Sequence, residues 1–429
     1  MARQHLRDLL LDHRARFLSE RATLYARSEE GRVAGLLAAP EVVALTGVRR
    51  CGKSSLLRRI GQRFARDAGP GAVLAVSFDD ERLADLRADA LGEVWEAFLE
   101  LGPPPGRRFL FLDEVQHVPG WERWVARLQA AGDCAIAVTG SNASLLGSDL
   151  STLLTGRHRQ VGLTPLSFPE FLSFRGVEAP SPQGLLPEER AALRREFQRY
   201  VELGGFPEVV KQEDPALARE YFRDIVQRDL AARYQVRHSA QYRALALFLA
   251  SNVGTRLSLR NLKALCGVRS ESSVRSYLEQ FGSAYLFALV SRFSWKLSRQ
   301  ASSPSKVYAV DHGLARAVSF RFSENRGAAL ENLVHSELAR RHEEVFYYET
   351  AGGREVDFLV RDRGQITGLI QACADLGHPP ARARESAALV EAMAELSVPA
   401  ATVVTWDDDE DLSGGVRAVS AWRWVVEGG

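Results

Sequence analysis

The 429-residue sequence lacks any run of about 18 apolar residues, so it offers no candidate for a membrane-spanning helix. The leucine-rich N-terminus does not resemble a secretory signal, because Asp8, Asp12 and several arginines interrupt it. Cysteine is also scarce. The four thiols lie far apart without a CxxC pair, which indicates neither a disulfide framework nor a zinc site. We therefore expect a cytoplasmic protein that does not span a membrane.

An excess of charge of one sign is missing as well. Lys and Arg number 55 against 54 Asp and Glu, so the formal charge is only +1 and no global field favours nucleic acid or a membrane surface. With 46% hydrophobic and 25% charged residues, the composition is typical of globular proteins, and the length predicts about three domains. Any basic binding surface must therefore be regional.

The first 165 residues alternate apolar, β-rich runs with helical segments. The runs are continuously apolar, which is typical of strands in a parallel sheet that is covered on both faces. After one or two helices in the first 40 residues, we expect strands at 41–47, 72–78, 109–112 and 134–142, and helices at 53–68 and 88–99. This pattern predicts an α/β domain.

The segment GVRRCGKSS matches the phosphate-binding pattern G-x-x-x-x-G-K-[ST] and lies between a predicted strand and a predicted helix. Glycines let backbone N–H groups wrap a β-phosphate, Lys53 reaches the β and γ oxygens, and the Ser54 hydroxyl can hold Mg²⁺. The residues that we expect at the nucleotide are Gly47, Val48, Arg49, Arg50, Cys51, Gly52, Lys53, Ser54 and Ser55.

Two further strand ends carry polar residues. Phe109 to Leu112 deliver Asp113 and Glu114 to the carboxyl edge of the sheet, where we expect Asp113 to orient Mg²⁺ and Glu114 to polarise the attacking water. Asn142, with Ser141, ends the next strand, where it is expected to touch the γ-phosphate or position water. Arg157 is either a cation that stabilises the transition state, in cis or across a subunit interface, or a solvated loop arginine.

The middle of the chain is helical, and one part of it is strongly basic. Residues 228–306 contain thirteen Lys and Arg against three acidic residues. Within them, 258–290 has helix-turn-helix spacing with a turn at Gly267, and 291–300 forms a possible basic wing. We expect salt-dependent DNA contacts from Arg275, Lys296 and Arg299, although such a module also serves protein interaction.

These motifs resemble a known family, the prokaryotic AAA+-type ATPases. The family's segments read here GVRRCGKSS, LDEVQ, TGSNASLL and GRHRQVGLTPLSFPEF, followed by GGFPEVV, YAVDHGLARA, ENLVHSEL and EVDFLV, so the resemblance extends over nearly the whole chain. It implies an ATPase module that uses ATP and Mg²⁺, a winged-helix DNA-binding domain and a C-terminal domain similar to PD-(D/E)xK nucleases. It also implies a homo-oligomer, because AAA+ sites usually borrow an arginine from a neighbouring subunit.

The expected division of the chain follows from the resemblance together with the shifts in composition. We predict an ATPase core over 1–165, a helical lid or linker over 166–227, a winged-helix domain over 228–310, and a small α/β, restriction-endonuclease-like domain over 311–429.

The nuclease-like segment departs from the nuclease pattern. Glu331 and Asp357 fall where the helix and strand carboxylates of a metal site belong, but Gln371 replaces the next acid and Cys373 replaces the lysine that assists the nucleophile. The acidic pair is therefore a possible Mg²⁺ site with incomplete cleavage machinery. A nuclease-derived fold that is used for DNA or subunit contacts is the other interpretation.

The leading hypothesis is a Mg²⁺-dependent ATPase that binds duplex DNA with little sequence specificity and couples hydrolysis to conformational change or movement on DNA. One alternative is an ATP-gated DNA nuclease, for example one that acts in defence against foreign DNA. The other is a nucleotide-switched regulator that binds a protein partner.

Overall fold

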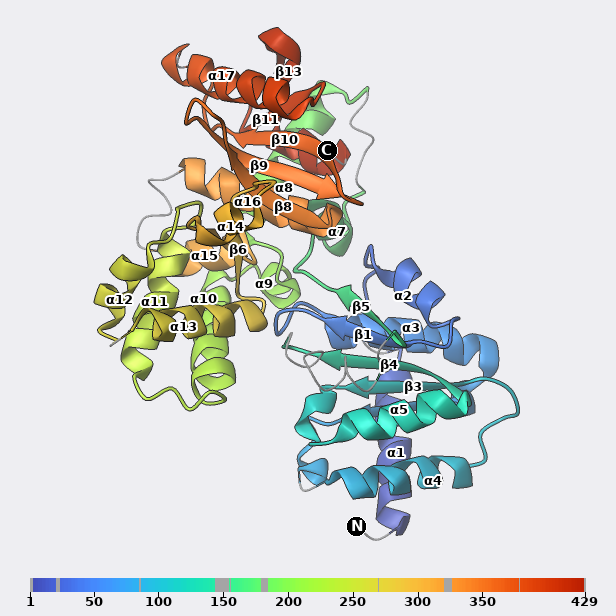
Figure 1. Ribbon diagram of the computed structural model, residues 1–429. Coiled ribbons are helices and arrows are strands. Elements are labelled where there is room, and N and C mark those ends of the chain that lie inside the picture. Colours follow the sequence, from blue (N-terminus) through green and yellow to red (C-terminus); the bar gives the residue numbers. More distant parts are fainter. Residues whose placement is uncertain are drawn as a thin grey trace. The chain divides into compact units, whose positions relative to one another are not determined.

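The computed structural model describes residues 3–20, 24–84, 86–142, 154, 156–178, 184–268, 270–319, 326–377 and 379–427. The chain divides into two compact units (Figure 1). Unit 1 comprises Met1–Thr164 with Ser283–Tyr285, and unit 2 comprises Pro165–Gly282 with Leu286–Gly429. We describe each unit by itself; the finer four-part division remains a prediction.

Unit 1 is built on a five-stranded parallel sheet with the order β2-β3-β4-β1-β5. The strands are β1 (Val42–Thr46), β2 (Val73–Ser77), β3 (Arg108–Asp113), β4 (Cys134–Gly140) and β5 (His158–Gly162). The helices are α1 (Arg3–Leu18), α2 (Glu30–Leu36), α3 (Lys53–Ala68), α4 (Leu91–Glu100) and α5 (Trp121–Ala131). The predicted α/β fold is confirmed, whereas the sequence analysis did not foresee β5.

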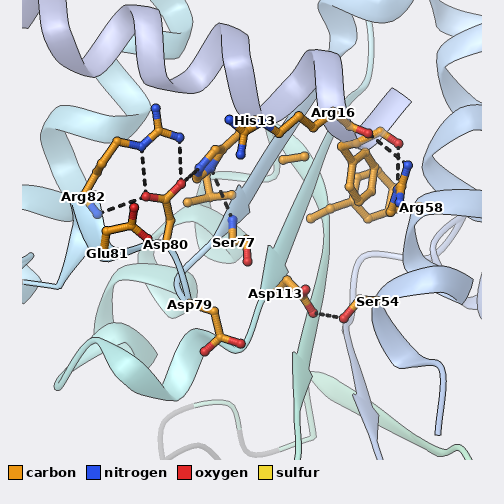
Figure 2. Close-up of a pocket in the computed structure, with 14 residues that line it drawn as sticks. His13, Arg16, Ser54, Arg58, Ser77, Asp79, Asp80, Glu81, Arg82 and Asp113 are labelled. Atoms are coloured by element: carbon orange, nitrogen blue, oxygen red, sulfur yellow. Dashed lines mark hydrogen bonds and ion pairs between the residues drawn. The ribbon is translucent and has the colours of Figure 1, made fainter. Parts of the chain in front are cut away.

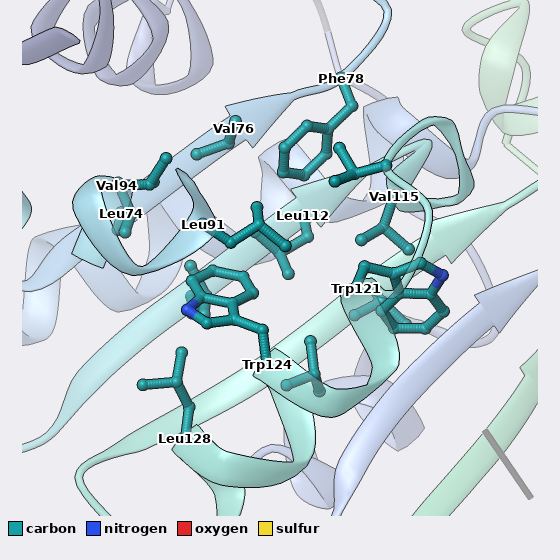
Figure 3. Packing of buried hydrophobic residues seen from close by; sticks show 14 of the residues in the cluster. Leu74, Val76, Phe78, Leu91, Val94, Leu112, Val115, Trp121, Trp124 and Leu128 are labelled. Carbon is teal, nitrogen blue, oxygen red and sulfur yellow. The ribbon is translucent and has the colours of Figure 1, made fainter. Parts of the chain in front are cut away.

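Side chains of successive strand residues leave opposite faces of the sheet of unit 1, and both faces are covered. On one face, Leu74, Val76 and Leu112 pack against Trp121 and Trp124 of α5 (Figure 3). A second group of apolar side chains lies on the other face. There the ring of Phe109 stacks on that of Phe64 of α3, with centroids 4.3 Å apart. This two-sided burial explains why the strands are apolar at nearly every position.

The first part of unit 2 is helical. Its helices are α7 (Phe168–Phe174), α8 (Pro187–Leu203), α9 (Pro207–Gln212), α10 (Pro215–Asp224), a π-helical segment (Ile225–Ala231), α11 (Ser239–Ser251), α12 (Leu259–Cys266), α13 (Glu271–Ser283), α14 (Leu297–Ser302) and α15 (His312–Val318). The antiparallel strands β6 (Phe287–Val290) and β7 (Lys306–Ala309) flank α14.

Two of the quoted motifs, GGFPEVV and YAVDHGLARA, pack against each other in unit 2. Gly204 has a φ of 75°, and a Cβ on it would lie 2.2 Å from Asp311 Oδ1, so only glycine fits this close approach. Asp311 in turn accepts hydrogen bonds from the backbone N–H groups of Gly205 and Leu314. The aspartate therefore caps α15 and fixes the turn before α9 at the same time.

The C-terminal part of unit 2 contains a mixed six-stranded sheet with the order β12-β13-β11-β10-β9-β8. The strands are β8 (Glu344–Glu349), β9 (Glu355–Asp362), β10 (Gln365–Ala372), β11 (Ala401–Thr405), β12 (Glu410–Asp411) and β13 (Val416–Ser420). The helices are α16 (Arg326–Arg341), α17 (Pro379–Leu396) and α18 (Ala421–Glu427). The expected α/β class is confirmed.

The segment before β7 joins this C-terminal sheet. Backbone hydrogen bonds link Phe293 N–H to Tyr347 O at 2.7 Å and Tyr347 N–H to Ser291 O at 3.1 Å, and the Phe293 ring belongs to the apolar core between β9 and α17. Residues of the predicted winged-helix segment therefore form part of the C-terminal core. Among the described residues, no helix combines the length and apolar character that crossing a bilayer requires.

Candidate nucleotide site and buried charge centre

The loop between β1 and α3 is shaped by glycines. Gly47 has a φ of 145°, and a Cβ there would lie 2.0 Å from Leu163 O, so a larger residue would displace the chain that follows β5. Gly52, with a φ of 105°, turns the chain into α3. The glycines therefore allow a tight loop directly before the N-terminus of α3, where backbone N–H groups favour the binding of an anion.

Lys53 is buried at the first turn of α3, with 4% of its surface exposed. Its ammonium donates to two loop carbonyl oxygens, Gly47 O at 2.9 Å and Val48 O at 3.1 Å. Among the described residues, no carboxylate lies within ion-pair distance of this ammonium. A buried cation that is held only by neutral groups is suited to receive the negative charge of a phosphate.

Ser54 and Asp113, the predicted magnesium ligands, lie together. The Ser54 hydroxyl donates to Asp113 Oδ1 at 3.0 Å, and the Thr139 hydroxyl donates to the same oxygen at 2.5 Å (Figure 2 shows the Ser54 contact). Burial raises the pKa of the Asp113 carboxyl despite these two hydrogen bonds. The sequence analysis missed Thr139, which ends the apolar strand β4 and links Asp113 to the backbone N–H of Glu114 at 3.0 Å.

Glu114 adopts a left-handed backbone conformation, with φ 49° and ψ 45°, which is rare for a residue other than glycine. Its Oε2 accepts hydrogen bonds from Gln116 and, at 3.5 Å, from the Ser141 hydroxyl. Asn142 is buried beside this strand end. Strain at a carboxylate that follows a buried strand is typical of functional positions, because it aims the side chain away from the sheet.

Arg27 is a second residue that the sequence analysis missed. It is buried and donates to Cys51 O at 2.9 Å and to Thr164 O at 2.7 Å, so it ties the phosphate loop to the chain after β5. Cys51 is also buried and donates to Leu163 O at 3.3 Å, and burial raises the pKa of its thiol. Cys51 therefore fills the base of the loop.

Arg157 lies away from the loop of its own chain. Its backbone O accepts from Val42 N–H at 2.9 Å, at the start of β1, whereas Gly47 follows the end of that strand. Five residues of extended chain separate the two ends by roughly 15 Å. Arg157 is exposed. The structure therefore brings together Lys53, Ser54, Asp113 and Glu114 but not Arg157.

A cavity of about 620 Å³ opens beside Ser54 and Asp113. Its far wall is a charged cluster on α1 and the chain after β2, in which Asp80 accepts from Arg82 and contacts His13 Nε2 at 2.9 Å (Figure 2). Hydrogen bonds from Arg82, and a further one from His13, hold the pKa of Asp80 well below its usual range. Ser54 and Asp113 thus face a cavity that is lined in part by charged side chains.

Comparison with known proteins agrees with this geometry. A family model described as an AAA domain matches residues 39–172, and models of two domains of unknown function, DUF8612 and DUF4143, match residues 194–325 and 326–424. The uncharacterized protein MJ1544 of Methanocaldococcus jannaschii is 30% identical over 406 residues, which cover 90% of this chain and 88% of that protein. The chain belongs to the same family as MJ1544.

A second relative and a solved structure extend the comparison. An uncharacterized protein of Haemophilus influenzae is 31% identical to this AAA-domain protein over 335 residues, which cover 76% of this chain and 80% of the relative. The Walker-type ATPase PABY2304 of Pyrococcus abyssi superposes with a TM-score of 0.41 and 17% identity, covering 70% of this chain and 99% of that one. The phosphate loop lies within residues 39–172, the part of the chain that matches the AAA-domain model.

The predicted DNA contacts of this AAA-domain protein lie on exposed parts of unit 2. Arg275 is on the exposed face of α13, and Lys296 and Arg299 lie in the segment that joins β6 to β7. Within the described part of the chain, none of these three side chains forms an ion pair. Trp295, which the sequence analysis did not single out, directly precedes Lys296 and is 72% exposed.

The predicted nuclease-like residues lie around a lysine that the sequence analysis had counted only as part of the basic segment. Lys306, at the start of β7, is 2% exposed and forms ion pairs with Glu331, Glu355 and Asp357. Burial alone would lower the pKa of Lys306, but the three carboxylates outweigh it and raise that pKa. Burial also raises the pKa of Glu331, to about 7. A lysine that opens an otherwise apolar strand was the available signal.

His335 and Cys373 are not part of this charge centre. The His335 ring stacks on Tyr308 with centroids 4.3 Å apart, and burial lowers its pKa to about 3, so it remains neutral. Cys373 is buried in the apolar core beside α17, where its thiol donates to Asp375 O at 3.4 Å. Both side chains therefore serve packing.

Proposed function

We propose that this protein hydrolyses ATP at the loop of unit 1 and that Mg²⁺ is its cofactor. The observation that carries the proposal is the 3.0 Å contact between Ser54 Oγ and Asp113 Oδ1, beside a lysine whose ammonium is held only by loop carbonyl oxygens. A hydroxyl and a carboxylate are hard oxygen ligands, which Mg²⁺ prefers. The donor set therefore fits the cofactor.

Each residue of the proposed site has a defined part. Lys53 and the N–H groups of residues 47–55 bind and orient the phosphates, Ser54 and Asp113 hold the cation, and Glu114 accepts a proton from the attacking water. Mg²⁺, when bound, neutralises charge that develops on the β and γ oxygens. Asn142, at the end of β4, is assigned to the γ-phosphate or to the water. The hydrogen bond from Thr139 keeps Asp113 oriented.

The position of Arg157 supports a homo-oligomer. An exposed arginine roughly 15 Å from its own loop is badly placed to act in cis, so we assign it to the site of a neighbouring copy. This part of the proposal predicts that ATP turnover rises with protein concentration and that Arg157→Ala is rescued by mixing with a subunit that lacks Lys53.

DNA is the second ligand that we propose. Support comes from the exposed and unpaired state, among the described residues, of Arg275, Lys296 and Arg299, and from Trp295, which directly precedes Lys296. Cations attract the phosphate backbone, and an aromatic ring provides a face on which a base can stack. Contacts of this kind do not read sequence, so low sequence specificity is expected.

The surface of the basic segment, residues 228–306, carries less positive charge than its composition suggests. Arg256 pairs with Glu349 and Glu355, Arg292 pairs with Glu349, and Lys306 is enclosed by carboxylates. Acidic residues of the C-terminal sheet thus neutralise three of the cations internally. These three cations are therefore left out of the proposed DNA surface, which we assign to α13 and the segment 295–299.

The deciding experiment is steady-state ATP hydrolysis with Mg²⁺, measured without DNA and with single-stranded or duplex DNA. Glu114→Gln is the inactive reference, and Glu93→Gln, an exposed glutamate on α4, is the matched control. We expect DNA to stimulate turnover in the wild type and in the control but not in Glu114→Gln. Slow turnover that is indifferent to DNA would favour the protein-bound regulator instead.

A further inference from the structure

The C-terminal centre deserves a test against the metal that the nuclease resemblance implies. Glu331 and Asp357 occupy the expected positions, but their oxygens are turned to Lys306. Its Nζ lies 2.8 Å from Glu331 Oε1, 3.0 Å from Asp357 Oδ1 and 2.6 Å from Glu355 Oε1. The ammonium donates hydrogen bonds to Glu331 and Asp357 and forms an ion pair with Glu355, so its charge is met by carboxylates from α16 and β9.

Further hydrogen bonds hold the groups around the centre in place. Asp357 Oδ2 accepts from Ala372 N–H at 3.1 Å, and Gln371 Oε1, the neutral candidate ligand, accepts from Asp357 N–H at 3.1 Å. Tyr308 donates its hydroxyl to Glu331 Oε1 at 2.6 Å. Across the described ranges, no three His, Cys, Asp or Glu side chains are arranged to hold a metal ion. With the ammonium of Lys306 in place, the donor set therefore does not fit a divalent cation.

Burial explains why the lysine must be there. The carboxylates of α16 and β9 would repel one another strongly without a cation, because little water is available to screen them. Glu331 and Asp357 are nearly enclosed, and the Lys306 side chain is only 2% exposed. Arg256 offsets the charge of Glu355 from the outer side at 2.5 Å. Each partner of the ammonium is thus held by a second contact.

We propose that the Lys306 ammonium is the resident cation of this centre and takes the place that a metal ion holds in a nuclease-like fold. The centre then binds no divalent metal and cleaves no DNA. Its role is to join two regions that match different family models, because Lys306 lies in 194–325 and its three partners lie in 326–424. This inference is independent of the ATPase and DNA proposals.

The proposal is tested by measuring Mn²⁺ binding to the nucleotide-free full chain. The EPR signal of free Mn²⁺ reports how much of the ion is bound. All samples carry Asp113→Asn, which removes the other candidate cation site. We expect no Mn²⁺ at the C-terminal centre of this background protein. Lys306→Ala should gain one Mn²⁺ per chain, and adding Asp357→Asn to Lys306→Ala should abolish the gain.

Two results would overturn the proposal. One is a saturable Mn²⁺ in the background protein that Asp357→Asn abolishes, since the centre would then hold metal beside the lysine. The other is a folded Lys306→Ala protein, verified by circular dichroism, that binds no Mn²⁺. If Lys306→Ala does not fold, the comparison of the background protein with its Asp357→Asn variant still decides the question, because absence of Mn²⁺ in both supports the resident lysine.

Discussion

Two buried lysines, one in each unit, have opposite surroundings. Lys53 and Lys306 are 4% and 2% exposed, so both ammonium groups have lost almost all contact with water. The partners of Lys53 are two carbonyl oxygens of its own loop, whereas those of Lys306 are three carboxylates. The first lysine keeps its charge uncompensated, and the second is compensated in full.

The difference separates a binding group from a structural one. An uncompensated buried cation is costly for the fold and is favoured only if a ligand supplies the counter-charge. A compensated one resembles a buried ion pair, which is strongly destabilising to break but attracts no further anion. Charge balance around a buried lysine therefore indicates function better than its burial or its position in a motif.

The largest expected effect is on the uncompensated lysine. Lys53→Ala should lower ATP turnover by about 1000-fold, because the cation stabilises charge that develops on the transferring phosphate. The same change should alter the free energy of unfolding by less than about 1 kcal/mol, because the loss of two carbonyl contacts is offset by removal of a costly buried charge. Turnover assays and urea titrations measure the two quantities. Normal turnover in Lys53→Ala would refute the assignment of the phosphate site.

The second prediction reverses the pattern at the compensated lysine. Lys306→Met should lower the free energy of unfolding of the C-terminal part by about 3 kcal/mol, because it leaves three buried carboxylates without a cation. Nucleotide binding, measured with a fluorescent ATP analogue, should be unchanged. The exposed Lys211→Met is the control and should shift stability by less than about 0.5 kcal/mol. Equal stability of Lys306→Met and Lys211→Met would break the comparison.

Sequence reasoning reached the nucleotide site because its residues are close together and their spacing is imposed by the phosphate. Lys53 and Ser54 are neighbours in one motif, and Asp113 ends a readable strand. Arg27 and Thr139 escaped notice because they act through the backbone or through another side chain, and no spacing rule constrains them.

The C-terminal centre was predicted in part for the same reason. Glu331 and Asp357 follow a known pattern, but Lys306 comes from a different segment and reaches them only when β7 packs beside α16 and β9. Because Cys373 stands where the pattern expects a lysine, the sequence suggested an incomplete site. Long-range pairing of this kind is a property of the fold, which composition and periodicity do not encode.

A smaller effect is expected where cations stay on the surface. Arg275→Glu combined with Lys296→Glu should reduce the slope of log Kd against log salt for duplex DNA by about 2, since each phosphate contact contributes roughly one unit. Fluorescence anisotropy over a range of salt concentrations measures the slope. Arg190→Glu, an exposed arginine on α8, is the control, and it should leave the slope unchanged. An unaltered slope in the double variant would exclude this surface as the DNA contact.

The smallest predicted effect concerns pH and distinguishes an ordinary ion-paired cluster from the Lys306 centre. Because the pKa of Asp80 is lowered in the folded state, chiefly by Arg82, Asp80 contributes stability above its unfolded value of about 4 that is lost as the pH falls below it. The free energy of unfolding of the wild type should fall as the pH is lowered into the acid range. In Asp80→Asn this fall should be smaller by on the order of 1 kcal/mol. The raised pKa of Lys306 has the opposite sign, so its contribution is complete at neutral pH and is lost only as the pH rises above the usual lysine range. Urea titrations of Asp80→Asn and Lys306→Met at several pH values separate the contributions of the two residues to stability. If Asp80→Asn changed stability only at alkaline pH, the role assigned to Asp80 would be contradicted.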